Sequence, residues 1–229
     1  MELFFCPVIM HHPILTGLSE LQANNIYAIG RNYAAHAREL NNPVPDRPVL
    51  FNKPSVSLTM EGIILIPPFV KKAHYEAELV VAIGKEGKNI PTKEALSYAA
   101  GYGLGIDVTA RDIQDELKEK SHPWLLAKGL DTFAPVSTFI RSKRITDPQD
   151  LSFTLEVNGE QRQKGDTSLM LFPVDKLIAF LSQFVTLLPG DLIFTGTPEG
   201  VGPLHDGDLL HANLCSGLVT MDIAVKRTS

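Results

Sequence analysis

The sequence predicts a β-rich α+β fold, a twisted roll or barrel-like sandwich of strands with a few covering helices. Short, β-branched apolar runs bounded by glycine and proline outnumber the helical patterns, and the two kinds do not alternate regularly. Regular alternation would favour a doubly wound sheet or a TIM-type barrel, so both are disfavoured. No linker-like stretch divides the 229 residues, and we therefore expect a single domain spanning 1–229.

The first half of the chain is predicted to start with a strand at 26–30 and a helix at 32–40, which Asn32 is suited to cap. Three prolines within 41–48 must end that helix. The elements predicted after this break are strands at 49–51, 63–66 and 76–83, a helix at 91–100, a strand at 101–108 and a helix at 109–120.

The second half contains a strong hairpin signal, Asn158-Gly159, because both residues tolerate the positive φ of a type I′ turn. It should join strands at 151–157 and 160–163. An amphipathic helix is predicted at 173–180. The tail is expected to hold strands at 192–195, 208–212 and 218–225.

Composition excludes several classes of protein. The net charge of −5 and the pI of about 5.8 give no support to a nucleic-acid or anionic-membrane partner. No run approaches the ~20 apolar residues that span a bilayer. The first residues lack the pattern of a signal or transit peptide. Cys6 and Cys215 are the only cysteines and suggest neither a disulfide scaffold nor a zinc knuckle. A soluble, cytoplasmic protein is expected.

Three carboxylates, Glu76, Glu78 and Asp107, carry the strongest functional signal. Glu76 and Glu78 are two apart on a predicted strand, so they share a face beside an apolar run that looks buried. Like charges there repel and lose hydration, and a divalent cation would reverse both penalties. Asp107 ends a second apolar run and is a plausible third ligand. Oxygen donors suit Mg²⁺, Mn²⁺ or Ca²⁺ rather than zinc. The alternative interpretation is a solvated edge strand.

His36 and Glu39 share a face of a short predicted helix, since they are three residues apart. A carboxylate beside an imidazole can orient it and raise its basicity, as water activation requires. The prolines that follow predict a weakly anchored helix that could order over a ligand as a lid. The alternative is an ordinary surface pair.

Arg111 and Gln114 also share a helical face, directly after Asp107, and would offer a guanidinium and an amide to a carboxylate. Alternatively, Arg111 faces solvent and pairs with nearby acids. Lys128 lies inside an apolar run, either as a snorkelling side chain or as a placed cation. The glycine-rich segment 195–203 follows a strand and could approach an anion, but it lacks the ending of a nucleotide P-loop.

Taken together, these segments resemble the fumarylacetoacetate hydrolase family, in the right order from about residue 26 to the C-terminus. The length is similar to the short, single-domain acylpyruvase-like branch. The matching segments are Gly30-Arg31-Asn32-Tyr33 with His36 and Glu39, Phe51-Asn52-Lys53-Pro54-Ser55, Tyr75-Glu76-Ala77-Glu78-Leu79, the run from Asp107 to Gln114, Pro123-Trp124, Ala127-Lys128-Gly129, Pro189-Gly190-Asp191 and Thr195-Gly196-Thr197-Pro198.

The resemblance implies a mixed β-sandwich roll that forms homodimers. It implies Mg²⁺ or Mn²⁺, with Ca²⁺ as a substitute, bound by the three carboxylates. It further implies His36 and Glu39 as a water-activating dyad on a lid, and Lys128 as a group for oxyanion stabilisation or proton transfer. The residues that would line the substrate are Arg111, Gln114, Thr197 and, at the root of the lid, Arg31. Asn32 stands near the position where the larger fumarylacetoacetases carry a further metal-binding aspartate.

The implied function is metal-dependent hydrolysis of the carbon–carbon bond of acylpyruvates, with oxaloacetate decarboxylation or tautomerisation on the same site. The substrate would be a small 2-oxo acid. Two alternatives remain open. One is an isomerase or decarboxylase of unsaturated 2-oxo diacids from aromatic degradation. The other is a non-catalytic metal- or ligand-binding protein on the same fold.

Overall fold

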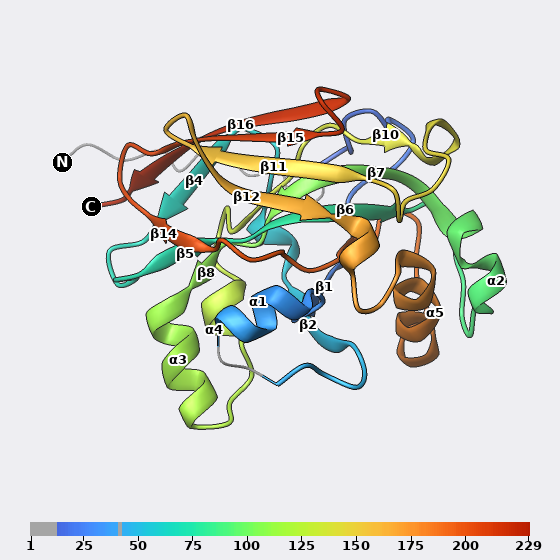
Figure 1. Cartoon of the computed structure of the whole chain (residues 1–229), viewed down its shortest axis with the longest axis horizontal. Helices are drawn as coiled ribbons and strands as arrows, with labels where there is room; N and C mark the ends of the chain where they lie inside the picture. The colour runs from blue at the N-terminus through green and yellow to red at the C-terminus, as the bar shows by residue number, and fades with distance from the viewer. Residues whose placement is uncertain (1–12, 41–42) are drawn as a thin grey trace.

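The computed structural model describes residues 13–40 and 43–229. Residues 1–12 and 41–42 lie outside the described part. They include Cys6, the first residues, to which the expectation about leader peptides applies, and the start of the proline-rich break. The described residues form a β-rich α+β fold with two main sheets, as the sequence predicts (Figure 1).

A six-stranded sheet forms the centre of the molecule. All its neighbouring strands are antiparallel except β1 and β13, which pair in parallel although they lie far apart in the sequence. In sheet order the strands are β10 (Ile140–Arg141), β7 (Ala99–Ile106), β6 (Ala77–Ile83), β13 (Leu192–Phe194), β1 (Ile26–Gly30) and β2 (Val49–Lys53).

A five-stranded sheet covers one face of the first and runs across the top of the molecule in Figure 1. In order its strands are β12 (Glu160–Asp166), β11 (Ser152–Val157), β15 (Leu209–Leu214), β16 (Val219–Arg227) and β4 (Ile63–Ile66). The hairpin prediction is confirmed, because Asn158 and Gly159 have φ values of 54° and 80° between β11 and β12.

Smaller β elements and the helices complete the fold. A three-stranded sheet holds β14 (Gly202–Leu204), β5 (Ala73–Tyr75) and β8 (Thr109–Ala110), and β3 (Leu58–Thr59) pairs with β9 (Ala134–Pro135). The helices are α1 (Ala34–Glu39), α2 (Thr92–Ala95), α3 (Arg111–Glu119), α4 (Leu125–Lys128) and α5 (Val174–Phe184). In Figure 1, α1, α3 and α4 gather on one side, whereas α2 and α5 lie together at the other end.

Strand β6 lies between two apolar cores, and all seven of its residues are buried. Leu79, Val81 and Ile83 belong to the larger core, which it shares with the five-stranded sheet. Val80 and Ala82 alternate with them and belong to a second, smaller core. Because successive strand residues face opposite ways, an unbroken apolar run is what a strand buried on both faces requires.

Several predicted element boundaries are wrong, and pairing with another strand explains the two that concern helices. The helix predicted at 109–120 begins at Arg111, because residues 109–110 form β8 and pair with β5. The helix predicted at 91–100 ends as a 3₁₀ turn at 98, because residue 99 already pairs with β6. The predicted strand at 76–83 begins at Ala77, and Glu76 lies between β5 and β6.

Asn32 does not cap helix α1, contrary to the prediction. The helix begins after Tyr33, which makes no side-chain cap. The buried Asn32 amide instead donates to the carbonyls of Phe172 and Thr195, at 3.0 and 2.8 Å, and accepts from the Phe172 amide at 2.8 Å. Asn32 therefore joins the end of β1 to two distant segments.

We expect Asn32→Ala to lower the free energy of unfolding by about 1–3 kcal/mol, because it leaves buried backbone groups without partners. Urea unfolding should show a lower midpoint with an unchanged slope. Asn52→Ala, at an exposed position on β2, is the matched control and should stay within about 0.5 kcal/mol of the wild type. Equal midpoints for the two variants would contradict this role of Asn32.

Candidate active site

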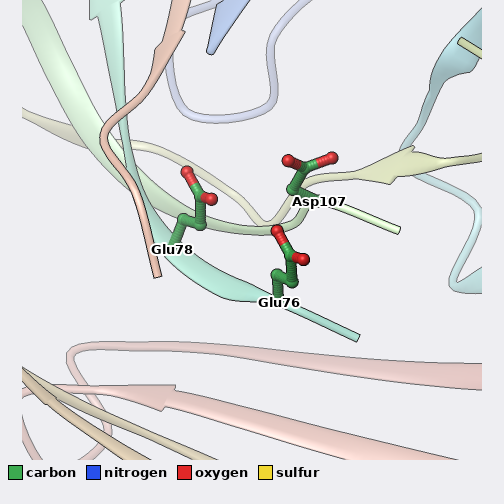
Figure 2. Close-up of side chains that lie close together, drawn as sticks. All are labelled: Glu76, Glu78 and Asp107. Atoms are coloured by element: carbon green, nitrogen blue, oxygen red, sulfur yellow. The ribbon is translucent and has the colours of Figure 1, made fainter. Parts of the chain in front are cut away.

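Glu76, Glu78 and Asp107 converge in one buried cluster, with one carboxylate oxygen of each lying within 4.8 Å of the others. Figure 2 shows the three carboxyl groups close together, with those of Glu76 and Glu78 projecting to the same side of their segment. The β6–β7 pairing causes this, because Ala77 faces Ile106 and the Asp107 amide donates to the Glu76 carbonyl at 2.8 Å. The solvated-edge interpretation is wrong, because none of the three is more than 6% exposed.

Three buried cations surround the carboxylates. Lys128 Nζ lies 2.9 Å from Glu76 Oε2 and 2.6 Å from Asp107 Oδ2. The Arg111 guanidinium contacts Glu76 and donates to Gln114 Oε1 at 2.6 Å. Lys53 Nζ, fully buried, lies 2.7 Å from Asp107 Oδ1. Three carboxylates and three cations thus share one buried volume.

Lys53 compensates the charge of Asp107 and also binds the backbone around it. Its three N–H groups are engaged by the backbone carbonyls of Val108, Lys128 and Phe133. Among the described residues, this ammonium is the one group paired with Asp107 Oδ1. Lys53 thereby ties the segments that carry Asp107 and Lys128 to the end of β2.

The two glutamates differ in their electrostatic surroundings. Burial opposes ionisation of Glu76, but the charges of Lys128 and Arg111 outweigh burial and hold its pKa below the usual value. Burial and the neighbouring Asp107 raise the pKa of Glu78 well above its usual value, and the Gly196 amide, at 2.7 Å, and the charge of Lys128 oppose them only in part. For Lys128, burial opposes the charged form, but the negative charges of Asp107 and Glu76 outweigh burial, and the pKa of Lys128 is raised.

These residues fit a hard divalent cation. All three donors are carboxylates, Glu78 has no cationic side chain among its hydrogen-bond and ion-pair partners in the described chain, and Asp107 Oδ1 is paired with the Lys53 ammonium alone among the described residues. A cation would relieve the repulsion that raises the pKa of Glu78. The donor chemistry therefore agrees with Mg²⁺ or Mn²⁺ and not with a thiolate- or imidazole-bound metal.

His36 and Glu39 form a pair on α1. His36 Nδ1 lies 3.3 Å from Glu39 Oε2, and Glu39 Oε1 accepts from the Gly200 amide at 3.0 Å. His36 Nε2 has no hydrogen-bond partner in the described part of the chain. Arg31, just before the helix, adopts φ 60°, a conformation uncommon for a side chain-bearing residue.

A cavity of about 30 Å³ lies between α1, α3 and α4 and connects most of the predicted residues. Space of that size holds a water molecule rather than a four-carbon acid, so a substrate would require the walls of the cavity to move. Seven of the ten predicted site residues line it, namely Arg31, His36, Asp107, Arg111, Gln114, Lys128 and Thr197. Glu39, Glu76 and Glu78 are not among its lining residues.

Sequence reasoning missed several groups of this site. It assigned no role to Lys53, because a lysine at a strand end before Pro54 looks like an ordinary surface residue. The structure buries this lysine. It did not single out Lys118, which lines the cavity with Trp124. It gave Arg111 the nearby acids as alternative partners, whereas Arg111 pairs with Glu76 and Asp112 accepts from the backbone of Lys71.

None of the helices in the described ranges is long and apolar enough to cross a membrane.

Comparison with known proteins shows the family to which the chain is similar. The model for the fumarylacetoacetate (FAA) hydrolase C-terminal domain matches residues 25–226. The chain is 46% identical over 205 residues to the mitochondrial oxaloacetate tautomerase FAHD1 of Mus musculus, covering 89% of this chain and 92% of that protein. The names of the mammalian relatives place those proteins in mitochondria.

Solved structures give the same result. A fumarylpyruvate hydrolase from Pseudomonas aeruginosa in complex with Mn²⁺ and pyruvate is 34% identical, with a TM-score of 0.84 over 91% of each chain. A 5-carboxymethyl-2-hydroxymuconate delta-isomerase from Mycobacterium smegmatis is 38% identical, with a TM-score of 0.79 over 95% of this chain and 81% of that one. Since the family model and these relatives cover nearly all of the described residues, the chain belongs to the fumarylacetoacetate hydrolase family.

Proposed function

We propose that this protein is a Mg²⁺- or Mn²⁺-dependent enzyme that interconverts the keto and enol forms of a small 2-oxo acid, with oxaloacetate as its substrate. The observation that carries the proposal is the buried cluster of three carboxylates with Lys128 and Arg111 at its edge. The similarity to oxaloacetate tautomerases over 89% of the chain supports the choice of substrate.

The charge of the site favours a dianion. When all six groups are ionised, Glu76, Glu78 and Asp107 are balanced by Lys53, Arg111 and Lys128. A divalent cation would add two positive charges to a region that water barely reaches. Because uncompensated buried charge is expensive, a ligand with two negative charges is the matching partner. Oxaloacetate carries two carboxylates and meets this condition.

The residues have distinct roles in this proposal. Arg111 and Gln114 hold a substrate carboxylate, because a guanidinium and an amide offer donors in a fixed geometry. Enolisation removes a proton from C3 and places one on the 2-oxygen. Lys128 faces the charge that develops on that oxygen, and His36 exchanges the carbon-bound proton. A bound divalent ion would supply Lewis-acid stabilisation of the enolate.

The His36–Glu39 pair supports a second function, hydrolysis of the carbon–carbon bond of acylpyruvates. With Nδ1 held by Glu39, His36 Nε2 is available to take a proton from water. The attacking hydroxide would add to the distal carbonyl, and the bond to the pyruvate enolate would then break. The similarity to a fumarylpyruvate hydrolase supports this activity. Isomerisation of unsaturated 2-oxo diacids would use the same enolate chemistry.

Keto–enol exchange of oxaloacetate, followed by the ultraviolet absorbance of the enol, tests the first function directly. Pyruvate release from acetylpyruvate tests the second.

A homodimer, a single domain over the whole chain, a cytoplasmic location and the absence of nucleic-acid partners stay predictions.

Glu78→Gln should weaken Mn²⁺ binding at least roughly tenfold, because it removes one of three anionic donors. Glu78 suits this test because, unlike Glu76, it has no cationic side chain that the substitution would leave unpaired. Affinity should also rise with pH, since a proton on Glu78 competes with the ion. Calorimetry on metal-stripped protein measures both, with exposed Glu86→Gln as the control. Equal affinities would show that Glu78 is not a ligand.

Arg111→Ala should raise KM roughly tenfold and change kcat much less, because its hold on a carboxylate is present in ground and transition states alike. The assay needs saturating Mn²⁺, since Arg111 also contacts Glu76. Gln114→Ala, which keeps the guanidinium, should give a smaller rise. An unchanged KM with a collapsed kcat would move Arg111 from binding to chemistry.

His36→Ala should slow acylpyruvate hydrolysis by roughly 100- to 10,000-fold, the usual effect of losing a general base. Decarboxylation of oxaloacetate should fall less, because it needs no nucleophilic water. Pyruvate formation from each substrate measures the two rates, and exposed His205→Ala serves as the control. Near-wild-type hydrolysis in both His36→Ala and Glu39→Gln would falsify the dyad. Equal loss of both reactions would indicate a general role of helix α1.

A further inference from the structure

The loop after β13 contacts three different parts of the candidate active site. The Gly196 amide donates to Glu78 Oε2 at 2.7 Å. Thr197 lines the cavity. The Gly200 amide donates to Glu39 Oε1 at 3.0 Å. A displacement of this five-residue segment, 196–200, would therefore disturb a carboxylate of the acid cluster, the cavity wall and the His36–Glu39 pair together.

One buried side chain from the other sheet holds this loop. Gln163, on β12, is 1% exposed. Its Nε2 donates to Thr197 Oγ1 at 2.9 Å, to the Pro198 carbonyl at 3.0 Å and, at 3.4 Å, to the Glu199 carbonyl. Its Oε1 accepts from the Ala77 amide at 2.9 Å. A single amide thus links three consecutive loop residues to the residue between Glu76 and Glu78.

These bonds fix the direction of the Thr197 hydroxyl. Thr197 Oγ1 donates its one hydrogen to the Ala77 carbonyl at 2.8 Å and accepts from Gln163. A hydroxyl has one donor and two acceptor positions. Toward a ligand it can therefore accept one more hydrogen bond but cannot donate one.

The backbone of the loop also lies directly against β12. Gly200 has φ +91°, and a Cβ at this position would come within 2.2 Å of the Arg162 carbonyl oxygen. Only glycine permits this approach. The neighbouring Gln163 therefore meets the loop at a fixed separation rather than across a gap.

We propose that Gln163 is a positioning residue for this site: it holds the loop 196–200 and orients the Thr197 hydroxyl, and through them it places Glu78 and Glu39. The kinetic part of this proposal rests on the proposed function, whereas the placement of the loop does not. Gln163 itself lies behind the loop and does not line the cavity.

The first experiment needs neither metal nor turnover. Hydrogen exchange of the metal-free protein should be at least about tenfold faster in peptides covering 195–201 for Gln163→Met than for the wild type. Gln161→Met is the matched control, because Gln161 is on the same strand but exposed, and its exchange should not change in those peptides. Wild-type exchange of 195–201 in Gln163→Met would overturn the proposal. If that variant does not fold, the isosteric Gln163→Glu takes its place, since it keeps the acceptor for Ala77 and loses the donors.

The second experiment asks whether Gln163 acts through Thr197. Gln163→Met, Thr197→Val and the double variant are compared in oxalate affinity of the Mn²⁺-loaded protein and in kcat/KM for oxaloacetate. Each single change should reduce both quantities roughly tenfold, because it loosens the loop that places Glu78. The double change should reduce them by little more, because the two residues share one interaction. A roughly hundredfold, additive loss would show that Gln163 acts independently of Thr197 and would overturn the coupling.

The two experiments separate failure of this proposal from failure of the proposed function. A wild-type protein that neither binds oxalate nor converts oxaloacetate would refute the function. Hydrogen exchange would still decide whether Gln163 holds the loop.

Discussion

The structure depends on the mutual compensation of charged side chains buried in one place, two carboxylates and three cations. Taking a single ion out of water costs several kcal/mol even after relaxation of the surroundings. The cluster is stable only because Lys53, Arg111 and Lys128 approach Glu76 and Asp107 from separate segments. The rest of the fold must therefore hold those segments in register, since the loss of any one partner leaves the buried charges out of balance.

Strand β6 provides this register. Its two faces are buried in different apolar cores, so it cannot slip by one residue without exchanging both sets of side chains. Its pairing with β7 brings Asp107 beside Glu76. The Lys53 ammonium donates to three backbone carbonyls close to Asp107, those of Val108, Lys128 and Phe133. Apolar burial thus fixes the backbone, and the backbone in turn fixes the charges.

The members of the site are not equally compensated, and this inequality is what makes it suitable for chemistry. Glu76 and Asp107 have cationic partners, whereas burial and Asp107 raise the pKa of Glu78. A metal ion would be drawn to the least satisfied carboxylate, and the resulting excess of positive charge would select an anionic ligand. Tautomerisation, decarboxylation and hydrolysis share the enolate that such a site stabilises. They differ in how His36 and Glu39 handle a proton or a water molecule.

The sequence by itself determined the properties that depend on near neighbours. Period-two spacing placed Glu76 and Glu78 together, the apolar run predicted a strand buried on both faces, and Asn158-Gly159 predicted its hairpin. The ordered motifs also identified the family. Local patterns carry this information because side-chain direction within one element follows from backbone geometry alone.

Only the tertiary structure decided which distant groups meet. Arg111 pairs with Glu76, 35 residues away, rather than with the acids of its own helix. Asn32 bonds across 140 residues instead of capping the adjacent helix, and Gln163 reaches Ala77 across 86. These contacts follow from the order of strands in the sheets, such as the parallel pairing of β1 with β13. A buried polar group takes whichever partner the packing brings within reach, and that partner is set by the whole fold, not by neighbouring residues in the chain.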